Sequence, residues 1–411
     1  MKLTKEISIL SAANGLISGG YALSVPFFAL YLNVERGLPA SAVGIATATA
    51  MLATALASGL SGEMTDAFGR RRVMSISLLL RGLNALCMAY AIYIRAHYMW
   101  TIMFYFTGSF FGAFFRPASN AWIADCVPMR DRVEAFGYIR IGWNIGWALG
   151  PALGGLMAGK SFALAFGVTG LFFLATSAFL NLNIKDSFTC PVARQTKFIE
   201  MVLELRHKRL ALICLFIFMI SLVSAQMVTG LSLHGVKYIG FTKEKVGLLF
   251  SVNGAMVVLL QYHMGKFMKE MRLTAALVAG CIAYACGYLL VGAAGAFAAA
   301  AVGVACFSVG EMAVSPGTNT LVSNIAPERE RGRYLGLQEL SRNAGYAAGM
   351  IAAGVMIEHL SPVHKMLPWT IVACVALAAG YGFYRLRPLL SAEEDGVSRI
   401  AEPFTEDEEI Q

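Results

Sequence analysis

The chain has 411 residues, of which 57% are apolar and only 14% are charged, and its net charge is +8. Soluble domains average roughly 45–50% apolar and 25% charged residues, so this composition excludes a water-soluble globular protein. The basic residues lie mainly between apolar stretches, which indicates a membrane topology and not a nucleic-acid-binding surface.

Apolar stretches of about 20 residues are long enough to cross the hydrocarbon core of a membrane as helices. The sequence lacks the short alternating segments of a closed β-barrel, and its first stretch is too long for a signal peptide. We therefore predict an all-α membrane protein with 12 transmembrane helices in two six-helix pseudo-symmetric bundles. The predicted helices cover residues 7–32, 40–62, 73–95, 98–126, 133–158, 162–184, 210–236, 244–267, 273–294, 296–325, 334–358 and 366–387.

A polar connector divides the predicted helices into six and six. The predicted parts are an N-terminal six-helix bundle at 1–184, a cytoplasmic connector at 185–209, a C-terminal six-helix bundle at 210–390 and a disordered acidic tail at 391–411. In the connector, four apolar residues would lie on one face of a helix, which predicts an interfacial helix on the membrane surface. These residues are Phe198, Ile199, Val202 and Leu205.

Arginine and lysine settle the expected orientation. The loops on the side of the two termini hold most of these residues, including Arg70–Arg72, Arg206–Arg209 and Arg329–Arg333. By the positive-inside rule both termini are cytoplasmic. We expect a multi-pass protein of a cell membrane, the bacterial inner membrane in particular.

The two halves of the chain repeat one another. Pro117, Asn120 and Gly146 recur 199 residues later as Pro316, Asn319 and Gly345, and earlier positions such as Gly37 and Gly44 recur at an offset of 203. Because each half has six helices, the copies run parallel and are related by an axis along the membrane normal. Parallel repeats of this kind are typical of transporters whose two halves rock about a site between them.

The loop after the second helix is rich in glycine and charge. Its glycines allow a tight turn and close helix packing, and Asp66 can lie against the positive N-terminus of a neighbouring helix. The arginines can pair with a carboxylate such as Asp125 at the end of the fourth helix. The alternative is a basic loop that only sets topology.

The fifth helix carries small residues at close spacing together with a proline. These are Gly137, Gly146, Gly150, Pro151, Gly154 and Gly155. Small residues let helices pack closely, and the proline removes a backbone hydrogen bond. A general small-residue packing seam would explain the same pattern.

These two motifs resemble those of the major facilitator superfamily, and the helix 5 pattern resembles its 12-helix drug:proton antiporter branch. The resemblance implies a conformational latch that docks on the start of the eleventh helix near Gly336. The latch residues are Gly62, Asp66, Gly69, Arg70, Arg71 and Asp125. Two positions differ from the drug exporters, because Phe104 stands where an arginine is common and the first helix carries no carboxylate.

Charged residues inside the predicted helices are candidates for a proton or substrate site, since a charge at the bilayer centre costs roughly 2.5–3.5 kcal/mol on insertion scales. Glu311 lies near the middle of the tenth helix, where its repeat-mate is Gly112. We expect Glu311 to titrate or bind a cation, or else to form a structural pair with an arginine. The full candidate set is Glu311, Arg116, Arg140, Asn144, Arg81, Glu339, Arg342 and Asn343.

Arg140 and Asn144 fall on one face of the fifth helix, and Glu339 and Asn343 occupy the matching face of the eleventh. Substrate contact and cytoplasmic gating are equally compatible with this stripe. Arg116 precedes the proline of the fourth helix and is suited either to an anionic substrate or phosphate, or to a structural partner such as Asp125.

The leading interpretation is a secondary active transporter with alternating access, a proton-coupled exporter of small amphipathic compounds. The alternatives are a carrier for an anionic metabolite or lysolipid, and a transporter-like sensor without flux. Scattered histidines give no catalytic or metal-binding cluster, so we expect no enzyme, metal or cofactor. The expected partners are a small-molecule substrate, protons and membrane lipids, with no nucleic acid and a monomeric chain.

Overall fold

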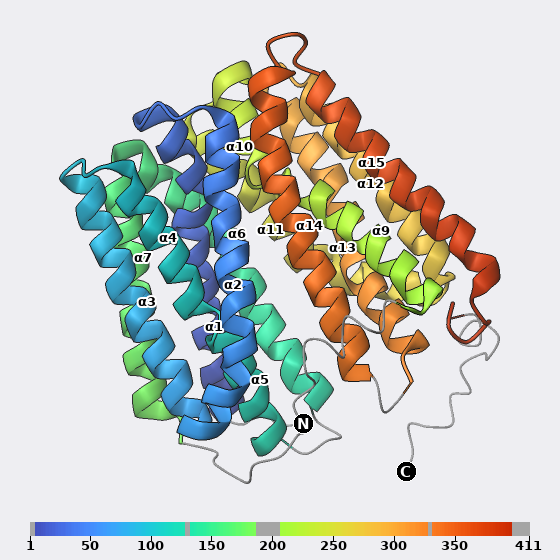
Figure 1. Ribbon diagram of the computed structural model, residues 1–411, viewed down its shortest axis with the longest axis horizontal. Helices are drawn as coiled ribbons and strands as arrows, with labels where there is room; N and C mark the ends of the chain where they lie inside the picture. The colour runs from blue at the N-terminus through green and yellow to red at the C-terminus, as the bar shows by residue number, and fades with distance from the viewer. Residues whose placement is uncertain (1–4, 128–131, 186–205, 328–330, 397–411) are drawn as a thin grey trace.

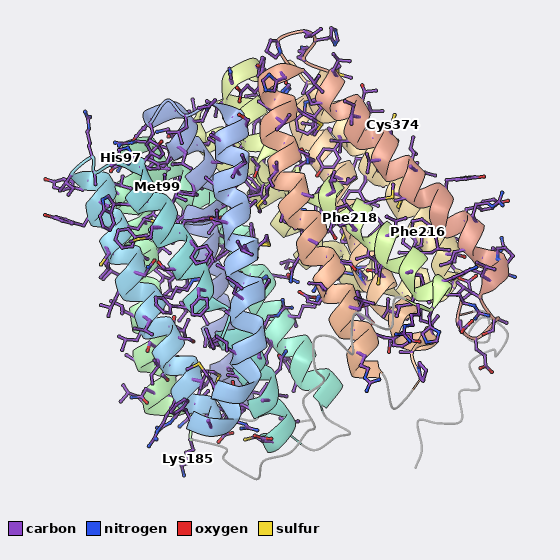
Figure 2. The ribbon with its side chains drawn as sticks, viewed as in Figure 1. His97, Met99, Lys185, Phe216, Phe218 and Cys374 are labelled. Atoms are coloured by element: carbon purple, nitrogen blue, oxygen red, sulfur yellow. The ribbon has the colours of Figure 1, made fainter. Side chains whose placement is uncertain are left out.

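The computed structural model describes residues 5–127, 132–185, 206–327 and 331–396. Within these ranges every regular element is helical, and the helices form two bundles that lie side by side (Figure 1). The first helix begins and the last helix ends at the same end of the molecule, which we call the terminal end. The other is the far end. His97 lies at the far end and Lys185 at the terminal end (Figure 2).

The first bundle contains six membrane-crossing segments. Its elements are α1 (Lys5–Leu30), the π-helical turn η1 (Tyr31–Glu35), α2 (Ala40–Phe68), α3 (Arg70–Tyr93), α4 (Tyr98–Gly112), α5 (Phe115–Cys126), α6 (Arg132–Lys160) and α7 (Phe162–Asn183). Here α4 and α5 together form the fourth crossing.

The second bundle repeats this order. Its elements are α9 (Lys208–Ala225), α10 (Gly230–His234), the π-helical turn η4 (Gly235–Ile239), α11 (Lys243–Lys269), α12 (Leu273–Ala293), α13 (Phe297–Ile325), α14 (Arg331–His359), α15 (Leu367–Leu386) and the short η5 (Arg387–Leu389). Here α9, α10 and η4 together form the first crossing.

The outer faces are apolar, as a lipid-embedded protein requires. Large side chains such as Leu149, Leu171 and Tyr262 are exposed, and Cys374 points outward from α15 (Figure 2). Within the described ranges, nine helical segments are long and apolar enough to span a membrane. The other three crossings are the interrupted α4–α5 pair and the polar-striped helices α6 and α14. The predicted fold class of twelve helices in two bundles is confirmed.

Two predicted helices are interrupted. The range 98–126 is broken at Ala113 and Phe114, because Pro117 has no N–H to donate to the Ala113 carbonyl one turn earlier. Its repeat-mate Pro316 lies inside an unbroken α13. The range 210–236 is broken between Ala225 and Gly230, where the Gln226 side chain donates to the Gly349 carbonyl at 2.8 Å. Because proline removes a backbone hydrogen bond, the sequence predicted a kink at Pro117 and at Pro316. The interruption near Pro117 agrees with this prediction, whereas the sequence pattern did not predict the break between Ala225 and Gly230.

The repeat is visible in the backbone. Gly37 and Gly240 follow the two π-helical turns with φ of +70° and +79°, a conformation that favours glycine. The mates Gly146 and Gly345 also share a role. A Cβ added to Gly146 would lie 2.5 Å from the Gly15 carbonyl oxygen of α1. A Cβ added to Gly345 would lie 2.3 Å from the Phe218 carbonyl oxygen of α9.

The predicted interfacial helix and residues 397–411 of the acidic tail lie outside the described residues. The prediction of disorder from residue 391 is wrong for 391–396. Asp395 is buried, and its carboxylate accepts hydrogen bonds from the Thr274 backbone N–H (2.8 Å) and hydroxyl (3.0 Å) at the start of α12. A carboxylate at this place supplies the cap that α12 otherwise lacks, so local chemistry overrides the acidic composition.

Replacing Asp395 with alanine removes this cap and leaves two donors without an acceptor. Helix caps contribute about 0.5–2 kcal/mol, so we expect Asp395→Ala to lower the free energy of unfolding by about 1 kcal/mol. Thermal unfolding of the purified protein measures the change. The control is Glu393→Ala, an exposed carboxylate of the same segment, and equal unfolding midpoints for the two variants would contradict the assignment.

Candidate functional site

The two bundles meet through backbone contacts toward the far end. A Cβ on Gly247 of α11 would lie 2.3 Å from the Pro151 carbonyl oxygen of α6, and a Cβ on Gly354 of α14 would lie 2.1 Å from the Ala40 carbonyl oxygen of α2. Only residues without a side chain permit these distances. The glycines therefore set how closely the bundles approach at this end.

Polar contacts reinforce the far end. The Glu358 carboxylate accepts a hydrogen bond from the Ser41 backbone N–H at 2.7 Å, and so caps α2 from the other bundle. The Lys243 ammonium donates to the Ala158 carbonyl at 3.2 Å and lies 3.9 Å from both the Glu35 carboxylate and the centre of the Phe162 ring. This lysine of the second bundle is thus held by three elements of the first.

Glu311 lies at the centre of the site, as the middle residue of the 29 in α13. Asn253 of α11 donates to the Glu311 carboxylate at 2.7 Å and to the Ser308 hydroxyl at 2.9 Å. Arg140 of α6 is close enough to interact electrostatically with Glu311 from the other bundle. No described cation forms an ion pair with Glu311 within 4.0 Å, so its nearest partners are neutral.

Two tyrosines of the second bundle, Tyr284 and Tyr346, interact electrostatically with this carboxylate. Tyr346 of α14 interacts electrostatically with Glu311 and, across the bundle interface, with Tyr21 of α1. Tyr21 packs edge to face on Trp147 of α6, with ring centroids 6.0 Å apart. The site therefore combines one acidic group with flat apolar surfaces from both bundles.

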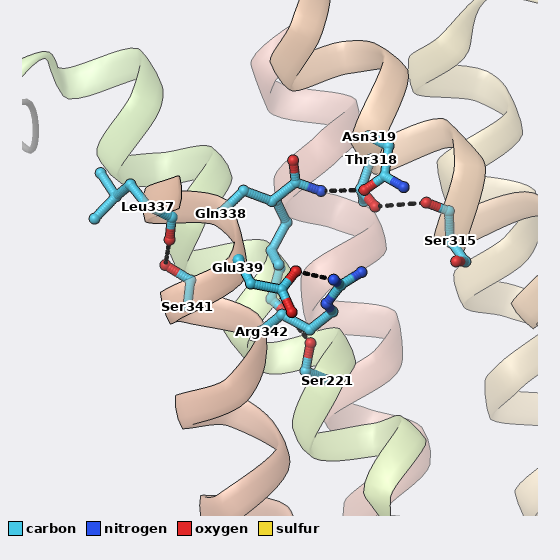
Figure 3. A network of polar contacts seen from close by, with 10 residues as sticks. Ser221, Ser315, Thr318, Asn319, Leu337, Gln338, Glu339, Ser341 and Arg342 are labelled. Carbon is cyan, nitrogen blue, oxygen red and sulfur yellow. Dashed lines mark hydrogen bonds and ion pairs between the residues drawn. The ribbon is translucent and has the colours of Figure 1, made fainter. Parts of the chain in front are cut away.

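A second polar group lies closer to the terminal end. Glu339 and Arg342 of α14 pair with each other, one turn apart (Figure 3). Gln338 donates to the Asn319 side-chain oxygen of α13, which joins the two helices. Glu339 is thus paired with a residue of its own helix. It does not pair with Arg140, its repeat-mate in the first half, which carries the opposite charge.

Arg116 of the first bundle lies within electrostatic range of Arg342 of the second. Arg116 is exposed, and no described carboxylate forms an ion pair with it. Asp125, the partner considered for it, binds Arg70 instead.

The latch motif is partly assembled. The Arg70 guanidinium donates from Nε to Asp125 at 2.9 Å and from Nη1 to the Thr65 carbonyl at 3.0 Å, so the predicted pairing with Asp125 is confirmed. Gly69 has a φ of +89° in the turn between α2 and α3, and Arg71 donates to the Asn181 carbonyl of α7. The surroundings of Gly62 and the side chain of Asp66 lie outside the described part of the chain.

The helix 5 motif divides between two neighbours. Gly146, Gly150 and Gly154 pack against α1 within the first bundle, whereas Gly155 faces Gly247 of the second. Pro151 contributes its carbonyl to that same contact. Gly137 lies in the early part of α6, and its surroundings are outside the described residues.

The remaining candidates are separate from Glu311 or unpaired. Asn144 and Asn343 are half-buried and make no side-chain hydrogen bond to another described residue. Arg81 lies inside the first bundle over the rings of Tyr21 and Phe173. Within the described part of the chain, no group of histidine, cysteine and carboxylate side chains is suited to hold a metal ion.

Sequence reasoning missed Asn253 and the far-end contacts of Lys243 and Glu358. Asn253 was detectable, since its repeat-mate at the offset of 203 is Ala50 and a polar mismatch inside an apolar helix points to a local role. Lys243 and Glu358 lie at helix ends, where charged residues are ordinary and give no signal.

Two bundles of six crossings around a central polar site define a polytopic membrane transporter. A sequence model of the Major Facilitator Superfamily matches residues 10–350, and the chain belongs to that family. It is 24% identical over 388 residues to the uncharacterized MFS-type transporter YdeE of Escherichia coli K12, covering 92% of this chain and 95% of that protein. It is 22% identical over 381 residues to multidrug resistance protein MdtH of Escherichia coli O157:H7, covering 91% and 93%.

Solved structures share the fold at low identity. The nucleoside transporter NupG has a TM-score of 0.75 and 15% identity, covering 94% of this chain and 99% of that one. A bacterial homologue of the human lysosomal transporter Spinster, in an inward-facing and occupied conformation, has a TM-score of 0.72 and 13% identity, covering 97% and 98%.

The far-end contact gives a direct test of how the bundles are held together. A leucine at Gly354 cannot fit against the Ala40 carbonyl, and overpacking of this kind costs about 1–3 kcal/mol. We expect Gly354→Leu to open the far end, so that a cysteine placed at Ser41 reacts with a maleimide about 5- to 150-fold faster. The control is Gly295→Leu, a position at the same end where a Cβ meets nothing within 4 Å. Equal rates in the two variants would show that the contact does not hold this end closed.

Proposed function

We propose that this protein is a proton-coupled secondary transporter that exports small amphipathic compounds by alternating access. The observation that carries the proposal is Glu311. It is a carboxylate at the middle of a membrane-crossing helix, with Asn253 as its hydrogen-bonding partner and within electrostatic range of Arg140 of the other bundle. An intramembrane carboxylate is costly to keep unless it has a role.

The surroundings of Glu311 suit reversible protonation. An amide side chain can donate from its NH₂ group to a carboxylate and can accept through its oxygen from a protonated acid, so Asn253 is compatible with both states. A cation in direct contact would hold the carboxylate ionised. Arg140 acts from a greater distance and from the other bundle, which ties its influence to the relative position of the two bundles.

The contacts between the bundles correspond to one state of the alternating-access cycle. The bundles are joined at the far end by Gly247, Gly354, Lys243 and Glu358. The positive-inside rule assigns the terminal end, with both termini, to the cytoplasm. We therefore infer an inward-open state, with the latch of Arg70, Asp125 and Asp66 available to stabilise the opposite state near the start of α14.

The preference for amphipathic substrates rests on the chemistry of the site and on the relatives. Tyr21, Trp147 and Tyr346 offer flat apolar contact surfaces, and Glu311 offers a single negative charge that attracts a cation. Two of the similar proteins are named multidrug resistance proteins, which agrees with this site.

The proposed organisation follows the repeat. The two bundles at 1–184 and 210–390 act as the rocking units of a monomer, and the connector at 185–209 joins them on the cytoplasmic side. The helix 5 motif serves both units, because Gly146 and Gly150 fix α6 against α1 while Gly155 forms part of the interface. We place the protein in the bacterial inner membrane.

Replacing Glu311 with glutamine keeps the hydrogen-bonding shape and removes the titratable proton. We expect proton-driven uptake of ethidium into inverted proteoliposomes to fall by about 100-fold, the range that a proton-transferring group contributes. Exchange of ethidium at equal pH on the two sides should persist, because it needs no net proton movement.

The matched control is Glu270→Gln, a carboxylate exposed at the end of α11. Unchanged proton-driven flux in Glu311→Gln would remove Glu311 from the coupling mechanism. Transport of lysophosphatidylglycerol in place of ethidium would instead identify a carrier for anionic lipids.

A further inference from the structure

The first bundle contains a cavity of about 40 Å³ that lies away from Glu311, between α1, α3, α4 and α7. Its polar lining includes Tyr21, Arg81, Asn84, Tyr105 and Ser109. Arg81 is the only charged residue in this lining, and no carboxylate contributes to it. A polar cavity needs about 10–15 Å³ to hold one water molecule, so this one has room for a group of several atoms.

The Arg81 guanidinium has only aromatic partners among the described residues. It lies 4.6 Å from the centre of the Phe173 ring and 5.3 Å from that of Tyr21. No described carboxylate pairs with it. Arg81 is half-buried, charges withdrawn from water are normally paired, and a guanidinium keeps its charge in nearly all protein environments. The cavity therefore carries a positive charge that no acidic group of the described chain neutralises.

The sequence repeat relates the position of Arg81 to that of Glu311. Gly112 of α4 is the repeat-mate of Glu311, and a Cβ at Gly112 would lie 2.2 Å from Nη1 of Arg81. The guanidinium thus lies beside the position that corresponds to Glu311. The mate of Arg81 is Tyr284, which interacts electrostatically with Glu311 in the second bundle. At these corresponding positions the second bundle has an acidic residue, Glu311, and the first bundle has a basic residue, Arg81.

Asn84 adds a second donor to the cavity. One N–H of its amide donates to the Thr107 hydroxyl at 2.6 Å, and an amide NH₂ group carries two such hydrogens. Tyr21 links the cavity to α6, since its ring centre lies 5.3 Å from the Arg81 guanidinium carbon and its ring packs edge to face on Trp147. Binding of a group at Arg81 would therefore affect the packing of Tyr21 on Trp147 at the bundle interface.

We propose that Arg81 and Asn84 form a binding site for one small anionic group inside the first bundle. The volume suits a carboxylate or a halide ion, which is either a free anion such as chloride or the carboxylate of a bound substrate. This site goes beyond the proposed function, because its occupancy does not depend on proton coupling at Glu311.

Thermal unfolding of the full-length protein in nanodiscs of zwitterionic lipid tests the proposal. The two probes are sodium chloride and sodium benzoate, each titrated at constant ionic strength against sodium isethionate, whose anion is neither a halide nor a carboxylate. We expect saturable stabilisation of the wild-type protein by at least one probe. Stabilisation by chloride identifies a free-anion site, and stabilisation by benzoate alone identifies a site for a substrate carboxylate. Stabilisation by neither probe would overturn the proposal.

Variants assign the effect to Arg81. Loss of a charge-assisted hydrogen bond weakens binding by about 10- to 100-fold, so Arg81→Gln should raise the apparent Kd of the stabilising probe by that factor. The control Arg95→Gln, an exposed arginine just beyond the same helix, should leave the Kd unchanged. An equal Kd in Arg81→Gln and wild type would refute the site.

Two further measurements keep the test open if Arg81→Gln does not fold. Arg81→Lys retains the charge but lacks the planar guanidinium and should bind the probe more weakly than wild type, whereas undiminished affinity would contradict direct recognition by the guanidinium. Anomalous diffraction from wild-type crystals grown in bromide should show a peak beside Arg81. A bromide-free cavity in a protein that chloride stabilises would place the anion elsewhere.

Discussion

The close approach of backbones at glycine is the constraint on which the rest of the structure depends. Gly247 and Gly354 bring helices of opposite bundles into contact, and Gly146 and Gly345 do the same within each bundle. Without a hydrophobic effect between helices in lipid, such packing must supply much of the association energy. The contacts between the bundles are concentrated in two helix pairs, α6 with α11 and α2 with α14, and alternating access requires these contacts to rearrange.

Charge is distributed unequally over this symmetric scaffold. The packing glycines recur in both halves, but Glu311 corresponds to Gly112, Asn253 to Ala50 and Arg81 to Tyr284. The second bundle therefore carries the acidic group and its amide partner, while the first carries Arg81 and Arg140. A conformational change that moves the bundles relative to each other changes the field that Arg140 exerts on Glu311, and this links proton binding to motion.

The fold followed from hydrophobic length and the internal repeat, since both depend on local sequence and on the bilayer thickness. The pairing of Arg70 with Asp125 was also predictable, because both lie at helix ends on one side of the membrane. The break at Ala113 depends on how the chain around Pro117 packs, and Pro316 shows that the same residue type can leave a helix continuous. The cap at Asp395 joins residues 121 positions apart, and an acidic composition gives no sign of such a contact.

The central claim is that protonation of Glu311 biases the equilibrium between states of the two bundles. Electron–electron distance measurements test it with spin labels at Leu182 and Tyr384, two exposed positions at the terminal ends of different bundles, in a background without native cysteines. The account predicts that lowering the pH changes the populations of a longer-distance and a shorter-distance state in the otherwise native protein. In Glu311→Gln both states should be present at a ratio that does not depend on pH. The same pH dependence in both proteins would contradict the account.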